Sequence, residues 1–155
     1  MVLPTASVVT ISKDIEDSAF YQNPNIKKLT FTDSITVGES SFSGCANLTT
    51  ISFYTGIEGV QFEENAFNGC SSLTELAIPD NIKVNHIAKD AFKDCTNLNK
   101  ISLNVVESDG TSTTCIDSDA FNGCTNVDTI EWLAKHYNVS GSDDFSDSPF
   151  YPIRD

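Results

Sequence analysis

One local pattern returns five times along this chain and constrains its fold more than any other feature. The pattern is centred on an Ala-Phe or Ser-Phe pair, and successive phenylalanines are separated by 22, 25, 25 and 29 residues. The five pairs are Ala19-Phe20, Ser41-Phe42, Ala66-Phe67, Ala91-Phe92 and Ala120-Phe121. A repeat of this length cannot bury its own apolar face, so successive repeats must stack into a solenoid with a shared core.

Five further columns of the repeat alignment are apolar in almost every copy, and they define the predicted core. The column five residues before Phe holds Ile15, Val37, Phe62, Ile87 and Ile116. The column three residues after Phe holds Asn23, Cys45, Cys70, Cys95 and Cys124, and the columns six, nine and eleven residues after Phe are apolar throughout. Because large-to-small changes in a core leave a cavity, Phe67→Ala or Phe92→Ala is expected to cost about 3–5 kcal/mol.

Each repeat also combines a predicted turn with a predicted short strand. The residue before each Ala-Phe or Ser-Phe pair is a preferred helix N-cap, which predicts a short helical turn; these residues are Ser18, Ser40, Asn65, Asp90 and Asp119. Two residues after Phe, glycines are expected in a left-handed conformation that ends the turn, with Gln22 and Asp94 as exceptions. The alternation in Leu76-Ala77-Ile78 and Ile101-Ser102-Leu103 predicts strands with one buried face.

These observations predict one α/β-type repeat domain: a right-handed solenoid with a parallel β-sheet on its concave face and short helical turns on the other side. Residues 1–14 are the predicted N-terminal cap or lead-in, residues 15–132 are five repeats, and residues 133–155 are a C-terminal cap and acidic tail. The 29-residue spacing places an insertion at residues 105–114, which is expected to form a protruding loop.

The pattern Ile-x-x-x-Ala-Phe-x-Gly-Cys-x-x-Leu-x-x-Ile-x-Ile resembles the BspA-like leucine-rich repeat, also called the Treponema pallidum type. The clearest copies are residues 62–78, 87–103 and 116–132, and the resemblance covers approximately residues 11–132. Members of this family are known mainly as surface or secreted adhesion and host-contact proteins of bacteria and parasitic protists. The resemblance therefore implies a non-catalytic module that binds a protein partner. It also implies a cell-surface or secreted location, and no signal peptide is visible in the chain.

The charge balance argues against two classes of partner. Asp and Glu number 22 against 9 Lys and Arg, and the formal net charge of −13 repels nucleic-acid backbones and anionic lipid headgroups. No apolar run approaches the roughly 20 residues that cross a bilayer, so direct membrane insertion is not expected. The 39% of apolar residues and the ten phenylalanines indicate a folded chain rather than a disordered one.

No catalytic site, metal site or cofactor is predicted. Four of the five cysteines share one repeat column without a Cys-x-x-Cys pair, which indicates a buried ladder of free thiols. Cys115 lies outside that column and is the candidate for a reactive thiol or for pairing with Cys124. His86 and His136 fall far apart in the repeat, which gives zinc or a catalytic triad no support. Of two glycosylation triplets, Asn47 is interpreted as structural and Asn138 as the more accessible.

The predicted partner-binding surface is the exposed side of the concave sheet. It comprises Lys28, Thr30, Thr50, Ser52, Glu75, Ala77, Lys100, Ser102, Thr129 and Glu131. Two interpretations remain open: a flat surface that hydrogen-bonds to an extended partner, or an ordinary solvated sheet face. The absence of aromatic and Arg side chains from these positions counts against the first and leaves the two about equally supported, because interfaces normally carry such anchors.

A second candidate surface combines the loop at residues 105–111 with the tail at residues 140–155. The tail is either a docking segment or a cap over the last repeat, since an open solenoid end exposes core. For the whole chain, a binding module is the leading hypothesis. A structural scaffold subunit, built permanently into a larger assembly, is the alternative.

Overall fold

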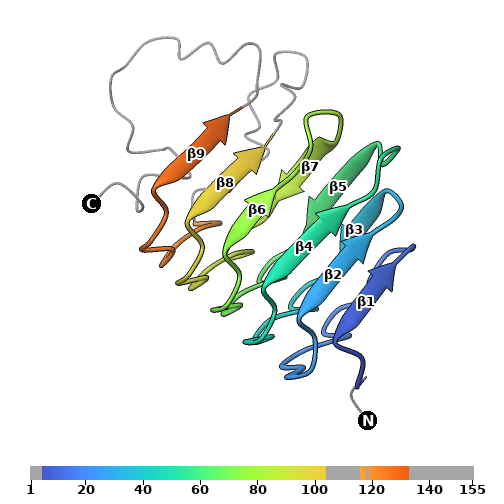
Figure 1. Ribbon diagram of the computed structural model, residues 1–155, viewed down its shortest axis with the longest axis horizontal. Coiled ribbons are helices and arrows are strands. Elements are labelled where there is room, and N and C mark those ends of the chain that lie inside the picture. The colour runs from blue at the N-terminus through green and yellow to red at the C-terminus, as the bar shows by residue number, and fades with distance from the viewer. Residues whose placement is uncertain (1–4, 104–115, 118, 133–155) are drawn as a thin grey trace.

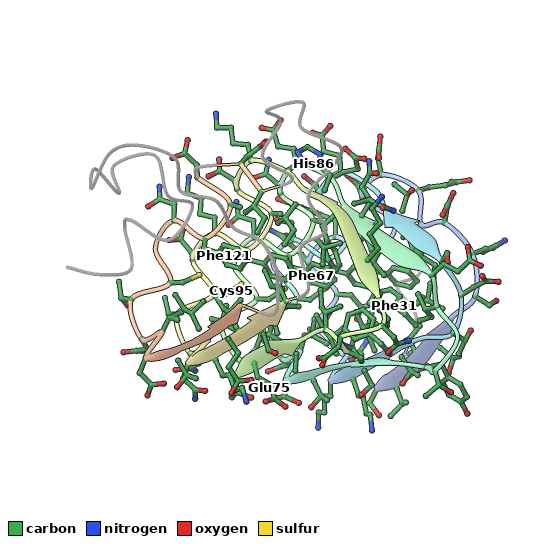
Figure 2. All side chains as sticks on the ribbon, turned by 90° about the horizontal axis from the view of Figure 1, so that it is seen from above. Phe31, Phe67, Glu75, His86, Cys95 and Phe121 are labelled. Atoms are coloured by element: carbon green, nitrogen blue, oxygen red, sulfur yellow. The ribbon has the colours of Figure 1, made fainter. Side chains whose placement is uncertain are left out.

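The computed structural model describes residues 5–103, 116–117 and 119–132, with only the backbone of Trp132. In these residues the chain winds into a solenoid whose strands pair only in parallel. We call one turn of the solenoid a coil. The strands form two layers with the core between them (Figures 1 and 2).

Six strands lie side by side in the first layer, which we call the long layer (Figure 1). They are β1 (Val8–Ile11), β2 (Lys28–Phe31), β4 (Thr50–Phe53), β6 (Glu75–Ala77), β8 (Lys100–Leu103) and β9 (Thr129–Trp132). One ladder joins β1, β2 and β4, and a second joins β6, β8 and β9. Strand β1 comes from the predicted lead-in at residues 1–14. The other five strands all begin eight residues after a Phe of the repeat, in the predicted strand region.

A second layer of three strands, which we call the short layer, was not predicted from the sequence. It consists of β3 (Ile35–Val37), β5 (Gly59–Phe62) and β7 (Lys83–Ile87). The bridges Ile15↔Val37 and Ile87↔Ile116 extend it at both ends. The apolar column five residues before each Phe therefore occupies this layer, as one aligned row.

The predicted helical turns are wrong: the described residues contain no helix. The supposed N-cap residues Ser18, Ser40, Asn65 and Asp90 have φ values of 57°, 54°, 58° and 56°, which is the left-handed region and not the extended conformation of an N-cap. The reason lies in the neighbouring coil. The amides of Asn65, Phe67 and Gly69 donate to the carbonyls of Lys89, Ala91 and Lys93 at 3.2, 2.7 and 2.8 Å. Alternate amides are thus used between coils and cannot form a helix.

The predicted left-handed glycines are confirmed. Gly44, Gly69 and Gly123 have φ values of 74°, 73° and 79°. The two predicted exceptions adopt the same conformation, with φ of 53° at Gln22 and 55° at Asp94. Their amides also donate to the next coil, at 2.7 and 2.9 Å, so the hydrogen bonds between coils hold even non-glycine residues in this region.

The Ala-Phe pairs form the centre of the core, as predicted. Adjacent phenylalanine rings stack almost in parallel, with centroid separations of 5.0, 5.1, 5.2 and 5.4 Å from Phe20 to Phe121. Phe62 of the short layer meets Phe67 and Phe92 edge-on, at 5.8 and 5.3 Å. Figure 2 shows Phe67 and Phe121 in the interior, while Glu75 and His86 lie on opposite outer sides.

Polar side chains at fixed positions also join the coils. Asn47 Nδ2 donates to the carbonyl of Pro24 at 2.8 Å, and Asn126 Nδ2 donates to the carbonyl of Thr96 at 2.6 Å. The predicted structural role of Asn47 is therefore confirmed, with the bond made to the preceding coil. Asn138 lies outside the described residues.

Candidate functional site

The candidate site is the outer face of the long layer, which the sequence predicted to be the concave side of the sheet. Strand pairing aligns the predicted residues into rows. Lys28 pairs with Thr50, and Thr30 with Ser52, in the first ladder. In the second ladder the rows are Glu75, Lys100 and Thr129, then Ala77, Ser102 and Glu131. The structure therefore brings the ten predicted residues together on one face.

Solvent exposure differs among these residues. Lys28, Glu75, Thr129 and Glu131 are exposed. Five are half-buried: Thr30, Thr50, Ser52, Ala77 and Lys100. The prediction that Ser102 belongs to an exposed binding surface is wrong. Ser102 is only 8% exposed and cannot contribute a substantial contact surface. It lies on β8 between β6 and β9, and the Lys100 Nζ–Glu131 Oε1 ion pair of 3.1 Å crosses from β8 to β9 on this face.

Charge on this face is mixed. The Lys100–Glu131 pair neutralises one charge of each sign, while Lys28 and Glu75 form no ion pair within the described residues. These two free charges lie on β2 and β6, on either side of β4. The face is therefore nearly neutral overall, in contrast to the net charge of −13 for the whole chain.

Sequence reasoning missed Val8 and Thr10, which pair with Lys28 and Thr30, and it also missed Tyr54. Tyr54 directly follows β4, and its amide donates to the carbonyl of Phe31 at 2.9 Å, which continues the strand pairing by one residue. Because side chains alternate along a strand, Tyr54 shares the face of Ser52. Its side chain is 61% exposed, the largest exposure among the large apolar or aromatic residues described. Extending the outward alternation by two residues beyond Ser52 would have found it.

The strand pairing of the long layer is interrupted between β4 and β6. No strand pairing joins them in the part of the chain that is described, whereas β5 and β7 of the same two coils do pair in the short layer. That pairing contains a register shift between Val60 and Gln61. Tyr54 therefore lies where the long layer is interrupted, two residues beyond the half-buried Ser52.

The cysteine column has no exposed reactive group among the described residues. Cys45, Cys70, Cys95 and Cys124 are buried free thiols, as predicted. Each Sγ donates to the carbonyl of the Phe in the preceding coil, at 3.0–3.3 Å. Burial raises the pKa of Cys45 to about 11 and raises those of Cys70 and Cys95 well above the usual value; for Cys95 the hydrogen bond with Cys124 is the largest cause. The thiols of Cys45, Cys70 and Cys95 therefore stay protonated at neutral pH. Cys115 lies outside the described residues.

Outside the cysteine column, one histidine and one aspartate lie close together. His86 Nε2 lies 3.1 Å from Asp117 Oδ1 on the short-layer side, and this pair joins two successive coils. Residue 136 and the candidate surface at residues 105–111 and 140–155 lie outside the described residues. Across residues 5–103, 116–117 and 119–132, no group of three or more His, Cys, Asp or Glu side chains could hold a metal ion. The same residues include no helix long and apolar enough to cross a bilayer.

Comparison with solved structures shows two bacterial relatives. A leucine-rich cell surface protein from Faecalibacterium prausnitzii is 28% identical with a TM-score of 0.65, over 97% of this chain and 35% of that protein. The chain therefore spans about a third of that relative's length. The Treponema pallidum leucine-rich repeat protein is 18% identical with a TM-score of 0.50, over 85% of this chain and 72% of that one, and shows the fold alone.

No protein with curated annotation matches the sequence. The model of the BspA-type leucine-rich repeat region matches residues 13–149, in six copies. This match covers most of the chain, including the stacked Phe and Cys columns and all the predicted repeats. The chain therefore belongs to the BspA-type leucine-rich repeat family.

Proposed function

We propose that this chain is a non-catalytic protein-interaction module that binds its partner through the outer face of the long layer, with Tyr54 as the principal contact. The observation that carries this proposal is the 61% exposure of Tyr54, which is the most exposed aromatic residue described and lies on a face whose other members are mostly polar. Tyrosine supplies a large, rigid contact area with a polar tip, and it is enriched among the residues that dominate binding energy. The predicted surface lacked such an anchor, and Tyr54 provides one.

The surroundings of Tyr54 fit a partner that lies flat across the strands. Thr30, Ser52 and Ala77 share one repeat position two residues before that of Tyr54, and all three are short and half-buried, so they would not obstruct a partner that contacts the tyrosine. Lys28 and Glu75 offer one free charge of each sign on the flanking strands. Free charges of opposite sign on a binding face select the orientation and the identity of a partner more than they add affinity.

The comparison with a solved structure favours a location of this chain on the cell surface. The Faecalibacterium prausnitzii relative, which this chain matches over 97% of its own length, is described as a cell surface protein. At that location, the function of a protein-interaction module would be adhesion to a partner protein or recognition of one. A scaffold subunit would instead copurify with a large assembly in fixed stoichiometry.

The test uses the whole chain, immobilised and screened against an array of secreted and cell-surface proteins. For the partner selected, Tyr54→Ala is expected to weaken binding by about 30-fold, which corresponds to about 2 kcal/mol. Tyr21→Ala is the matched control, because Tyr21 is 46% exposed but lies in a turn away from this face. It should change the dissociation constant less than twofold.

A combined replacement of Thr50, Glu75 and Lys100 by alanine tests the rest of the face. If neither this variant nor Tyr54→Ala alters binding to the selected partner, the outer face of the long layer is not the binding site and the proposal is wrong.

A further inference from the structure

The boundary between β4 and β6 lacks hydrogen bonds that the other described boundaries of the long layer have. At each of those boundaries, the carbonyl just before a strand accepts an amide from the next coil at 2.8–3.3 Å; these carbonyls belong to Ser7, Lys27, Thr74 and Asn99. The carbonyl of Thr49 has the equivalent position before β4, and no backbone amide of a described residue donates to it. The two strands are therefore separate from their first residues onward.

Pro79 removes the hydrogen bond at the other end of the same boundary. One coil earlier, the amide of Tyr54 donates to the carbonyl of Phe31 at 2.9 Å and so continues the pairing of β2 with β4. Pro79 occupies the repeat position of Tyr54 in the next coil, and proline has no amide hydrogen. The carbonyl of Phe53, which has the repeat position of Phe31, therefore receives no donor from residue 79.

Apolar side chains are also less well covered at this boundary. Phe53 is half-buried, although Phe31 and Ile78, which have its repeat position in the coils on either side, are 0% and 1% exposed. Ile51 of β4 is 6% exposed, while Leu76 of β6 is fully buried. Few buried apolar contacts and missing backbone hydrogen bonds are the marks of a place where a fold opens locally.

The opposite side of the solenoid stays joined across the same two coils. The amides of Asn65, Phe67 and Gly69 bond to the turn of the next coil at 3.2, 2.7 and 2.8 Å, and β5 pairs with β7 in the short layer. That pairing shifts register between Val60 and Gln61, and within the described residues no other strand pairing contains such a shift. The two coils are thus tied along the turns and the short layer and separate along the long layer.

We infer that this boundary is a hinge, kept open by Pro79, at which the coils up to that of β4 and β5 tilt against the coils from that of β6 and β7 onward. Hinge motions of this kind occur on the microsecond-to-millisecond timescale. The outer face of the long layer crosses the hinge, with Lys28 and Thr50 on one side and Glu75 and Lys100 on the other (Figure 1). A partner that spans both sides would bind one tilt angle and shift the population toward it.

The test compares two pairs of spin labels placed at one repeat position of the whole chain. Lys28→Cys with Glu75→Cys crosses the hinge, whereas Glu75→Cys with Thr129→Cys lies within the ladder of β6, β8 and β9. All three positions are exposed, and the cysteines of the buried column are inaccessible, so Cys115→Ser in every variant leaves only the introduced thiols for labelling. Double electron–electron resonance should give a distance distribution about twice as wide for the pair that crosses the hinge.

Pro79→Thr supplies the missing amide, and threonine already occupies this repeat position at Thr32. Because Pro79 is exposed, the substitution leaves the core unchanged, and circular dichroism checks the fold of each variant. Pro79→Thr should narrow the distribution of the Lys28–Glu75 pair to the width of the control pair. Equal widths for the two pairs with Pro79 in place, or an unchanged Lys28–Glu75 width in Pro79→Thr, overturns the inference.

Discussion

Phe67→Ala tests the stacked core most directly. The Phe67 side chain is fully buried, and its ring lies 5.1 Å from that of Phe42 and 5.2 Å from that of Phe92. Phe62 covers its edge at 5.8 Å. Truncation of a buried Phe costs about 3–5 kcal/mol. Because both ring faces are stacked and the backbone between coils is hydrogen-bonded, the cavity has little freedom to collapse, and we expect a loss of about 4–5 kcal/mol.

Phe20→Ala is the matched control for this change. Phe20 occupies the same repeat position, but its ring stacks on Phe42 alone and its side chain is only partly buried. With less area removed from water, its loss should be about 1–2 kcal/mol.

The free energies of unfolding of the parent chain, Phe67→Ala and Phe20→Ala are compared by urea titration, followed by far-ultraviolet circular dichroism. Equal losses at the two positions, or a loss below about 2 kcal/mol for Phe67→Ala, would refute the account of the core as a continuous stack.

Three further predictions concern the turns, the thiols and the sheet surface. A Cβ at Gly123 would clash with Asp94 Oδ1, and the φ of +79° is a conformation that L side chains rarely adopt, so Gly123→Ala should lower the free energy of unfolding by about 2 kcal/mol or more. In the Asp94→Gly background the clash is absent, and urea titration of the double variant should show partial recovery; no recovery would contradict this assignment. Burial raises the pKa of Cys45 from 9.0 to about 11, so the folded state holds this proton more tightly than the unfolded state. Stability should therefore be fully present below pH 9 and decline as pH rises toward 11, with a shallower decline in Cys45→Ala; identical profiles would refute the assignment. The Lys100–Glu131 pair is 37% and 49% exposed, so a double-mutant cycle should give a coupling below about 1 kcal/mol, and a larger value would show that the pair is a structural element.

The buried columns of the repeat could be predicted from the sequence because they depend on local chemistry repeated at one position. Cys70 and Cys95, or Phe67 and Phe92, are identical side chains in equivalent places, and stacking is the arrangement that buries all of them. The predicted strand at Leu76-Ala77-Ile78 corresponds to β6 for the same reason, since alternation of apolar residues already identifies the buried face.

The candidate site was predicted in part. The alternation of side chains placed Lys28, Thr50 and Glu75 on the outer face, where the structure has them. Ser102 satisfies the same alternation but is buried, because its exposure depends on neighbouring strands rather than on its own strand. Tyr54 was missed because it follows the last residue of its strand, where the repeat pattern ends.

The sequence by itself therefore determined that this chain is a stack of coils, most of the side chains that form its core and the part of each repeat that forms a strand of the long layer. The tertiary structure decided the backbone of the turns, the existence of the short layer and the interruption between β4 and β6. Asn65 shows the physical reason. An Asn at this position is compatible with an N-cap or with a left-handed turn, and the choice is made by the bond from its amide to Lys89, 24 residues away in the next coil. Hydrogen bonds between coils are not encoded in any local pattern, so they emerge only when the coils are stacked.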